Sequence, residues 1–236
     1  MNIKIFICML LCVGFIVFFQ ASTAHGGSGR VLSAWASVTP TIDGVLSSGE
    51  WNDADSLPCT TTGGVDCIVY VKNDAGNMYF AVMTKDSTLS QDTKGTDSVW
   101  LYFDNDHDGL GPEDGDDIVG WVGYQSEGFR DGYSAGTYVW SRDIDDRGTS
   151  DGSAVATGDG TYNYFEISHP LDSRDDAHDF SLSFGDTVGF GIRISIDGFD
   201  RGWWPSSIPS DWLNIEVAAR AQTYPFKIYS FPSGVS

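Results

Sequence analysis

The chain has 236 residues, with 13 Lys and Arg against 33 Asp and Glu, and a formal net charge of -20. A nucleic-acid binder that depends on phosphate contacts needs a basic face, so this charge excludes that class of protein. The charge also opposes docking on anionic lipid. Because 28 of the acidic residues are Asp and only 5 are Glu, and because the chain also has 28 Gly, the composition favours turns over helices. The 41% hydrophobic content is enough for a sizeable core, so the charge does not imply disorder.

The first 24 residues have the pattern of a secretory signal peptide. Lys4 precedes the apolar run Ile5–Phe19, and Ser22 and Ala24 occupy the -3 and -1 places of a cleavage site. The alternative is an uncleaved membrane anchor, although the 15 apolar residues are fewer than the roughly 20 that a spanning helix needs. We therefore expect a secreted protein, with a flexible leader at 25–30 followed by one domain at 31–236.

Two cysteines remain after removal of the predicted signal peptide. Cys59 and Cys67 flank a short segment that contains Gly63 and Gly64, which permit a tight reversal. In an oxidising compartment an even number of cysteines predicts a disulfide, and two free buried thiols are the alternative. With no further cysteine pair, a cysteine-based zinc site and a c-type haem are excluded.

The strand candidates are short segments rich in β-branched and aromatic residues, bounded by Gly, Asp and Asn. They are Cys67–Lys72, Met78–Thr84, Asp97–Asp104, Ile118–Tyr124, Tyr133–Ser141, Ser153–Thr157, Tyr162–Ser168, Thr187–Ile196 and Phe226–Phe231. The first two form a hairpin through Asn73–Asn77, and short helical turns are expected at Ser48–Ala54 and Trp212–Glu216. This spacing predicts an all-β fold, an antiparallel β-sandwich of the jelly-roll or immunoglobulin-like kind.

An acidic loop follows the third strand candidate. Aspartates alternate along the chain up to Gly109, which resembles the Asp-x-Asp-x-Asp-Gly calcium loops of dockerin and thrombospondin-type repeats. Calcium takes six to eight oxygen ligands, and glycine permits the sharp turn such a loop needs. The loop is not an EF-hand, since its twelfth position is Gly115. We predict a calcium site, with a solvated acidic loop as the alternative; the candidate ligands are Asp104, Asp106, Asp108, Glu113, Asp114, Asp116 and Asp117.

Two weaker acidic groups come later in the chain. The first surrounds two arginines, Arg142 and Arg147, and consists of Asp143, Asp145, Asp146 and Asp151. The second surrounds Arg174 and His178, and consists of Asp172, Asp175, Asp176 and Asp179. Pairing with the internal basic residues explains both groups, and a second cation site in either is the alternative.

Adjacent tryptophans mark a candidate sugar-binding segment. Sugars stack their apolar C–H faces on exposed aromatic rings, and their hydroxyls take hydrogen bonds from polar side chains. Trp203 and Trp204 lie beside Arg201 in a segment with Gly and Pro, and both cannot easily enter a core. Packing against the acidic loop or a neighbouring subunit is the alternative. Trp51 and Trp100 are expected in the core.

Residues 40–54 (PTIDGVLSSGEWNDA) resemble the opening signature of the family 9 carbohydrate-binding-module-like domains, also called CBM9-like or DOMON-like domains. Three later stretches keep the family order: Met78–Val82 with Asp86, Asp97–Asp104, and Phe165–Ile167 running to Gly185–Phe190. The resemblance implies a β-sandwich found as a module of secreted glycan-degrading enzymes, often with bound calcium, and a clamp of two tryptophans around the sugar. Trp203 or Trp204 would supply one, and Trp121 or Trp140 could supply the other.

The segment Phe165–Leu171 and the Gly-Asp-Thr-Val-Gly-Phe run after it are also similar to the ethylbenzene-dehydrogenase-related branch of this superfamily. The haem subunit there carries a b-type haem. This resemblance implies a haem-binding electron-transfer subunit as an alternative function. The residues that could act as axial ligands are Met78, Met83, Lys85 and His169.

No catalytic motif is readable in the chain. Its five glutamates are scattered and nominate no pair of carboxylates for glycoside hydrolysis, and there is no phosphate loop or HExxH motif. We therefore expect a non-enzymatic, secreted, calcium-binding protein that binds carbohydrate or a cell-surface glycan. An extracellular structural protein that self-associates in a calcium-dependent manner is the second possibility.

Overall fold

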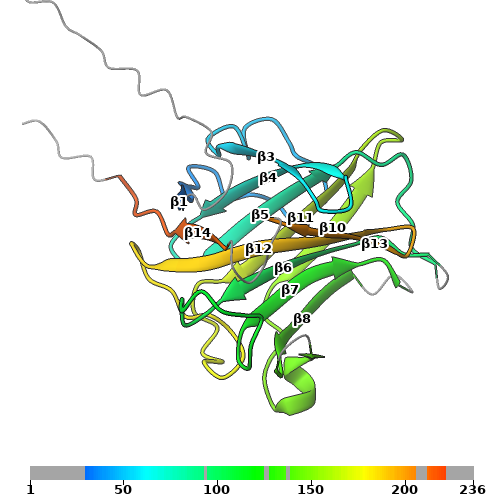
Figure 1. The fold of residues 1–236 in the computed structure, drawn as a ribbon. Helices are drawn as coiled ribbons and strands as arrows, with labels where there is room; N and C mark the ends of the chain where they lie inside the picture. Colours follow the sequence, from blue (N-terminus) through cyan, green and yellow to red (C-terminus); the bar gives the residue numbers. More distant parts are fainter. Residues whose placement is uncertain (1–29, 93–94, 125–127, 137–138, 206–211, 222–236) are drawn as a thin grey trace, which may run out of the picture.

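The computed structural model describes residues 30–92, 95–124, 128–136, 139–205 and 212–221. The predicted signal peptide, all of the leader except Arg30, and the strand candidate Phe226–Phe231 lie outside these residues. Within them the chain forms two β-sheets that pack face to face, as Figure 1 shows. The predicted all-β sandwich is confirmed.

The larger sheet has eight strands. Its order is β1-β14-β12-β6-β7-β8-β9, and β13 pairs with β12 beside this path. The strands are β1 (Arg30–Leu32), β6 (Ser98–Asp104), β7 (Asp117–Val122), β8 (Gly128–Ser134), β9 (Trp140–Ser141), β12 (Thr187–Ile196), β13 (Phe199–Trp204) and β14 (Leu213–Glu216). A short 3-10 helix, η2 (Asp143–Asp146), follows β9.

The smaller sheet has six strands in the order β10-β11-β5-β4-β2, with β3 also paired to β4. The strands are β2 (Ala34–Trp35), β3 (Ser56–Thr60), β4 (Asp66–Asn73), β5 (Asn77–Thr84), β10 (Ser153–Gly158) and β11 (Asn163–Pro170). The predicted hairpin is the antiparallel pair β4–β5. Both sheets are mainly antiparallel, and each has one parallel pairing at an edge, β1 with β14 and β2 with β4.

The core fills the space between the sheets with residues that alternate along the strands. Phe103 of β6 and Phe190 of β12 meet Phe80 of β5, with ring centroids 5.5–5.8 Å apart. All three rings are fully buried. Burial of such rings supplies much of the hydrophobic stabilisation and fixes the two sheets against each other.

The opening motif packs on the outer face of the smaller sheet. Glu166 of β11 accepts hydrogen bonds from the backbone N–H groups of Asp43 and Gly44 and from the indole N–H of Trp51, at 3.0, 2.8 and 2.7 Å. Gly44 has a φ of 80°, a left-handed conformation that glycine adopts without strain. Trp51 is buried, as expected from the sequence.

A buried lysine secures the same segment to the sheet. Lys72 of β4 is fully buried, donates to the backbone carbonyls of Val38 and Glu50, and pairs with Asp53. Burial opposes ionisation of Asp53, but the hydrogen bonds from Lys72 and Ser37 outweigh it and lower the pKa of the carboxyl to about 2. The charge of Lys72 is therefore compensated, as a buried ammonium requires.

Three local predictions are wrong. Tyr133–Ser141 is not one strand, because β8 ends at Ser134 and β9 begins at Trp140, and the backbone N–H of Ala135 donates to the carbonyl of Val139. Trp212–Glu216 is not helical, because its last four residues pair with β12 as β14. Ser48–Ala54 forms turns instead of a helix.

Two further details concern Arg30 and the cysteines. Arg30, which the sequence assigns to the leader, is the first residue of β1. The predicted disulfide is confirmed, since Cys59 of β3 and Cys67 of β4 are directly opposite each other and bonded, with Cα atoms 4.9 Å apart.

Candidate functional site

Aromatic side chains gather on the outer face of the larger sheet. They form one cluster, which we call the aromatic face, consisting of Trp100, Tyr102, Trp140, Trp203 and Trp212. Trp100, Trp140 and Trp203 are each partly exposed, whereas Tyr102 and Trp212 are buried beneath them. The prediction that Trp100 lies in the core is wrong, because β6 alternates and only its odd positions, such as Leu101, turn inward.

Glycines make room for these rings. A Cβ atom at Gly120 of β7 would lie 2.9 Å from Cε3 of Trp100, and one at Gly132 of β8 would lie 2.6 Å from Nε1 of Trp140. The two indoles therefore extend over β7 and β8 and meet with ring centroids 5.6 Å apart. The result is a broad aromatic surface on the strands themselves, which needs no loop to form it.

Polar groups frame the aromatic face on one side. The guanidinium carbon of Arg193 of β12 lies 5.4 Å from the ring centroid of Trp203. The ring centroids of Trp203 and Tyr102 are 4.5 Å apart. Asp200 holds the same guanidinium through hydrogen bonds of 2.7 and 3.3 Å. The hydrogen bond to Asp200 raises the pKa of Arg193 above its usual value, so this cation is permanent.

Arg130 frames the other side, next to a small pocket. Its guanidinium carbon lies 5.6 Å from the ring centroid of Trp140. Burial and the nearby charge of Arg142 lower the pKa of Arg130 below its usual value. A pocket of about 210 Å³ opens here, lined by Phe129, Arg130, Asp131, Arg142, Ile144 and Ser150. Guanidinium donors beside an indole are suited to sugar hydroxyls stacked on an aromatic ring.

The other residues proposed for sugar binding lie elsewhere. Trp121 is 4% exposed and packs against Phe165 in the core, so it offers no face to a ligand. Trp204 is half-buried and packs against the same core. Arg201 lies over Phe199, with its guanidinium carbon 5.7 Å from that ring, and takes no part in the aromatic cluster. Of the five residues, Trp140 and Trp203 belong to the aromatic face.

The acidic loop brings together three of the seven carboxylates predicted to bind calcium. Oxygens of Asp104, Asp106 and Asp108 lie within 4.8 Å of one another. Asp104 is buried at the end of β6, and the other two are exposed. Burial, together with the charges of Asp106 and Asp108, raises the pKa of Asp104, and the charge of Asp108 raises that of Glu113.

The remaining predicted ligands have different surroundings. Asp116 accepts backbone hydrogen bonds from Asn105 and Glu113 at 3.1 and 3.0 Å and so shapes the loop, and burial raises its pKa to about 6. Asp114 is exposed. Asp117 turns inward from β7 and joins a different group of side chains.

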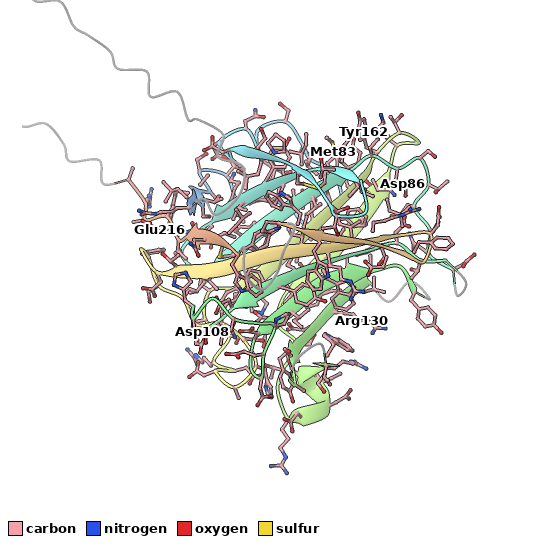
Figure 2. The ribbon with its side chains drawn as sticks, viewed as in Figure 1. Met83, Asp86, Asp108, Arg130, Tyr162 and Glu216 are labelled. Atoms are coloured by element: carbon pink, nitrogen blue, oxygen red, sulfur yellow. A yellow bond between two sulfur atoms is a disulfide. The ribbon has the colours of Figure 1, made fainter. Side chains whose placement is uncertain are left out.

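The acidic loop is attached to the aromatic face. The indole N–H of Trp212 donates to the carbonyl of Leu110 at 2.7 Å, and Nε2 of His107 lies 2.8 Å from Oδ1 of Asn214. In Figure 2, Asp108 and Arg130 lie at well-separated positions, so the loop and the pocket are distinct places. Ordering the loop would nevertheless stabilise the aromatic face through Trp212.

A second group of ionisable side chains is buried between the sheets. It contains Asp117, Asp131, His169 and Asp179, and Asp143 lies beside it. Asp143 and Asp179, which the sequence pairs with neighbouring basic residues, are instead buried in or beside this group, whereas Asp175 lies 2.9 Å from Nδ1 of His178, as such pairing predicts. Burial raises the pKa of Asp131 to about 7 and that of Asp143 to about 8. His169, although burial opposes its charge, has a pKa raised to about 9 by the surrounding carboxylates.

Sequence reasoning missed this group. It treated His169 as a candidate haem ligand, placed Asp117 among the calcium ligands and Asp143 and Asp179 in two separate acidic groups, and made no prediction for Asp131. Asp117 lies two residues before the core residue Val119 on β7, and Asp131 of β8 is paired with Val119, so all three share the inward face of the sheet. The alternation of Asp117 with Val119 was readable in the sequence, whereas the pairing with Asp131 was not.

No protein-family model matches the chain, and no curated protein matches its sequence. Solved structures share its fold. A family 9 carbohydrate-binding module from Caldicellulosiruptor kristjanssonii, in complex with cellotriose, matches with a TM-score of 0.53 and 14% identity over 83% of this chain and 98% of the module. The same kind of module with glucose gives a TM-score of 0.54 and 15% identity over the same shares of both chains.

A Bacteroides uniformis protein described as a candidate carbohydrate-binding protein also matches, with a TM-score of 0.53 and 6% identity over 80% of this chain and 99% of that protein. The fold is therefore that of the CBM9-like sandwiches. The comparisons give no support to the resemblance to the ethylbenzene-dehydrogenase-related branch. Among the described residues, no helix has the length and apolar character needed to cross a bilayer.

Proposed function

We propose that this protein is a secreted, non-catalytic carbohydrate-binding domain whose ligand stacks on the aromatic face. The observation that carries the proposal is the placement of Trp100, Trp140 and Trp203 on one sheet face, with Arg130 and Arg193 against two of the rings. Similar folds that bind cellotriose and glucose support it, since they make short glucans the first ligands to test.

Calorimetry with cello-oligosaccharides, preceded by a glycan screen, tests the proposal. We expect Trp140→Ala and Trp203→Ala each to weaken binding by about tenfold or more, which corresponds to about 1.4 kcal/mol. Trp35→Ala is the matched control, because Trp35 is also partly exposed but lies in β2 of the other sheet. The proposal fails if no glycan binds, or if the Trp35 variant loses as much affinity as the other two.

The same proposal includes calcium bound at the acidic loop. Asp104, Asp106 and Asp108 supply three close carboxylates, and calcium prefers oxygen ligands of this kind. We expect calcium to raise the melting temperature and a chelator to reverse the change. Replacing Asp106 and Asp108 together by Asn should abolish the effect, whereas Asp55→Asn, at an exposed site elsewhere, should preserve it.

An unchanged melting temperature in calcium would contradict the calcium site without affecting the glycan experiment. Light scattering in calcium and then in chelator tests the alternative of calcium-dependent self-association. A reversible increase in particle size would favour assembly, and a constant size would favour a binding domain that acts alone.

A further inference from the structure

The interior contains a set of ionisable side chains that the proposed function does not use. We call it the buried carboxylate cluster, and it consists of Asp117, Asp131, Asp143, His169 and Asp179. None of these residues is more than 4% exposed. They come from β7, β8, η2, β11 and the segment between β11 and β12, so the cluster spans both sheets.

The spacing inside the cluster is that of ligands around one ion. One ligand atom each from Asp117, Asp131, His169 and Asp179 lies within 4.8 Å of the other three. Nε2 of His169 is 3.6 Å from an oxygen of Asp179 and 3.9 Å from an oxygen of Asp131. These distances are too long for hydrogen bonds. Two ligands that each lie about 2.1 Å from a shared ion are roughly 3 to 4 Å apart, and both distances from Nε2 of His169 fall in this range.

The histidine is oriented as a ligand. Its Nδ1 atom lies 2.9 Å from the backbone carbonyl oxygen of Pro170, which can only accept a hydrogen bond. The Nδ1 atom therefore carries a proton, and in the neutral ring Nε2 presents its lone pair to the carboxylates. A backbone carbonyl that fixes the tautomer in this way is the usual support of a metal-binding histidine.

Most polar atoms of the cluster have no hydrogen-bond partner. Both oxygens of Asp117, Asp143 and Asp179, one oxygen of Asp131 and Nε2 of His169 are buried and unpartnered. A single imidazolium N–H could satisfy only one of these seven oxygens. Leaving buried carboxylates without partners is strongly unfavourable, so they must either take up protons or share a further positive group. The close approach of four ligand atoms to one another fits a shared positive group.

We propose that the buried carboxylate cluster binds one divalent transition-metal ion, Mn²⁺ or Zn²⁺, which links the two sheets. The donor set combines carboxylate oxygens with an imidazole nitrogen. Calcium and magnesium select oxygen ligands, whereas imidazole suits the transition metals. The ion would therefore differ in kind from the calcium proposed for the acidic loop.

Such an ion would also support the aromatic face. Asp143 lies in η2, three residues after Trp140 of β9, and Asp131 lies next to Arg130 in β8. Coordination of Asp131 would secure β8, which pairs with β9 and so supports Trp140, while Asp143 lies beside the site. The proposal does not depend on sugar binding, because it rests on the cluster alone.

The test uses the whole folded protein. The protein is unfolded, freed of metal with a chelator, and refolded with Mn²⁺, Zn²⁺ or Ca²⁺ supplied alone, because a buried site fills most readily during folding. We expect about one equivalent of Mn²⁺ or Zn²⁺ to remain after desalting, measured by elemental analysis. For Mn²⁺-loaded protein, pulsed electron paramagnetic resonance should show coupling to one imidazole nitrogen.

Variants then locate the ion. Asp179→Asn and His169→Gln, which keep size and shape, should each weaken retention by at least about tenfold. The double replacement of Asp106 and Asp108 by Asn is the matched control and should leave retention unchanged. If either cluster variant fails to fold, the nitrogen coupling in the wild-type protein still decides the assignment.

Three outcomes would overturn the proposal. They are folded wild-type protein that retains neither Mn²⁺ nor Zn²⁺, retention of Ca²⁺ alone, and a retained Mn²⁺ ion without nitrogen coupling. Failure of the glycan experiment would leave this result untouched, so the two proposals are tested separately.

Discussion

At the scale of single residues, Asp97 shows how burial changes the chemistry of a carboxyl. It is 1% exposed and accepts backbone hydrogen bonds from Ser90 and Asp197 at 3.0 and 2.8 Å. Burial raises its pKa to about 6, and the hydrogen bonds compensate only in part. Asp97 therefore connects its own segment to those of Ser90 and Asp197. Its charge at neutral pH is unfavourable in this buried position.

This shift predicts a pH-dependent contribution to stability. Because the folded-state pKa of Asp97 lies above the ordinary value of an aspartate, about 4, the protonated form is favoured on folding, and stability is lost as the pH rises from about 4 through about 6. Urea unfolding of wild type and Asp97→Asn should show the wild type losing up to about 3 kcal/mol relative to the variant between pH 4 and pH 7. A constant difference across this range would contradict the raised pKa.

At the scale of elements, the glycines of β7 and β8 decide whether the aromatic face can form. A Cβ atom at Gly132 would lie 2.2 Å from the carbonyl oxygen of Ser141 and 2.6 Å from Nε1 of Trp140. We expect Gly132→Ala to displace β9, to destabilise the fold by about 1–3 kcal/mol and to change the tryptophan fluorescence.

Gly76→Ala is the matched control for this change, because only one atom lies within 4 Å of its added Cβ, at 3.9 Å. Denaturant unfolding should therefore give near wild-type stability for the Gly76 variant. Equal stabilities for the two variants would show that the close approach of β9 to Gly132 is wrong.

The strands that the sequence predicts well are the long ones with many β-branched or aromatic residues. Thr187–Ile196 has the predicted bounds, and the β4–β5 hairpin was readable from its turn residues. Edge strands such as β2 and β9 have two residues each, too short for a period to appear. Leu213–Glu216 forms a strand because it pairs with β12. This pairing cannot be read from the sequence of the segment itself.

At the scale of the whole molecule, the site residues were predictable only where they are neighbours in sequence. The acidic loop and the tryptophan pair were visible as motifs. The aromatic face unites Trp100, Trp140 and Trp203 from three strands, and the buried cluster draws on five separate segments. Such sets depend on sheet order and register, which single-sequence patterns do not determine.

The net charge of -20 acts on the folded molecule as a whole. Repulsion among these charges destabilises the compact state, and salt reduces it, since the Debye length falls from about 30 Å at 0.01 M to about 8 Å at 0.15 M. We expect added NaCl, in the presence of a chelator, to raise the melting temperature at pH 7 by a few degrees, because about 1 kcal/mol corresponds to roughly 2–4 °C at this size. The control is the same titration near the isoelectric point of about 4.1, where the net charge vanishes and the increase should disappear. An equal increase at both pH values would mean that salt acts through hydrophobic burial, and that the acidic surface is accommodated without measurable cost.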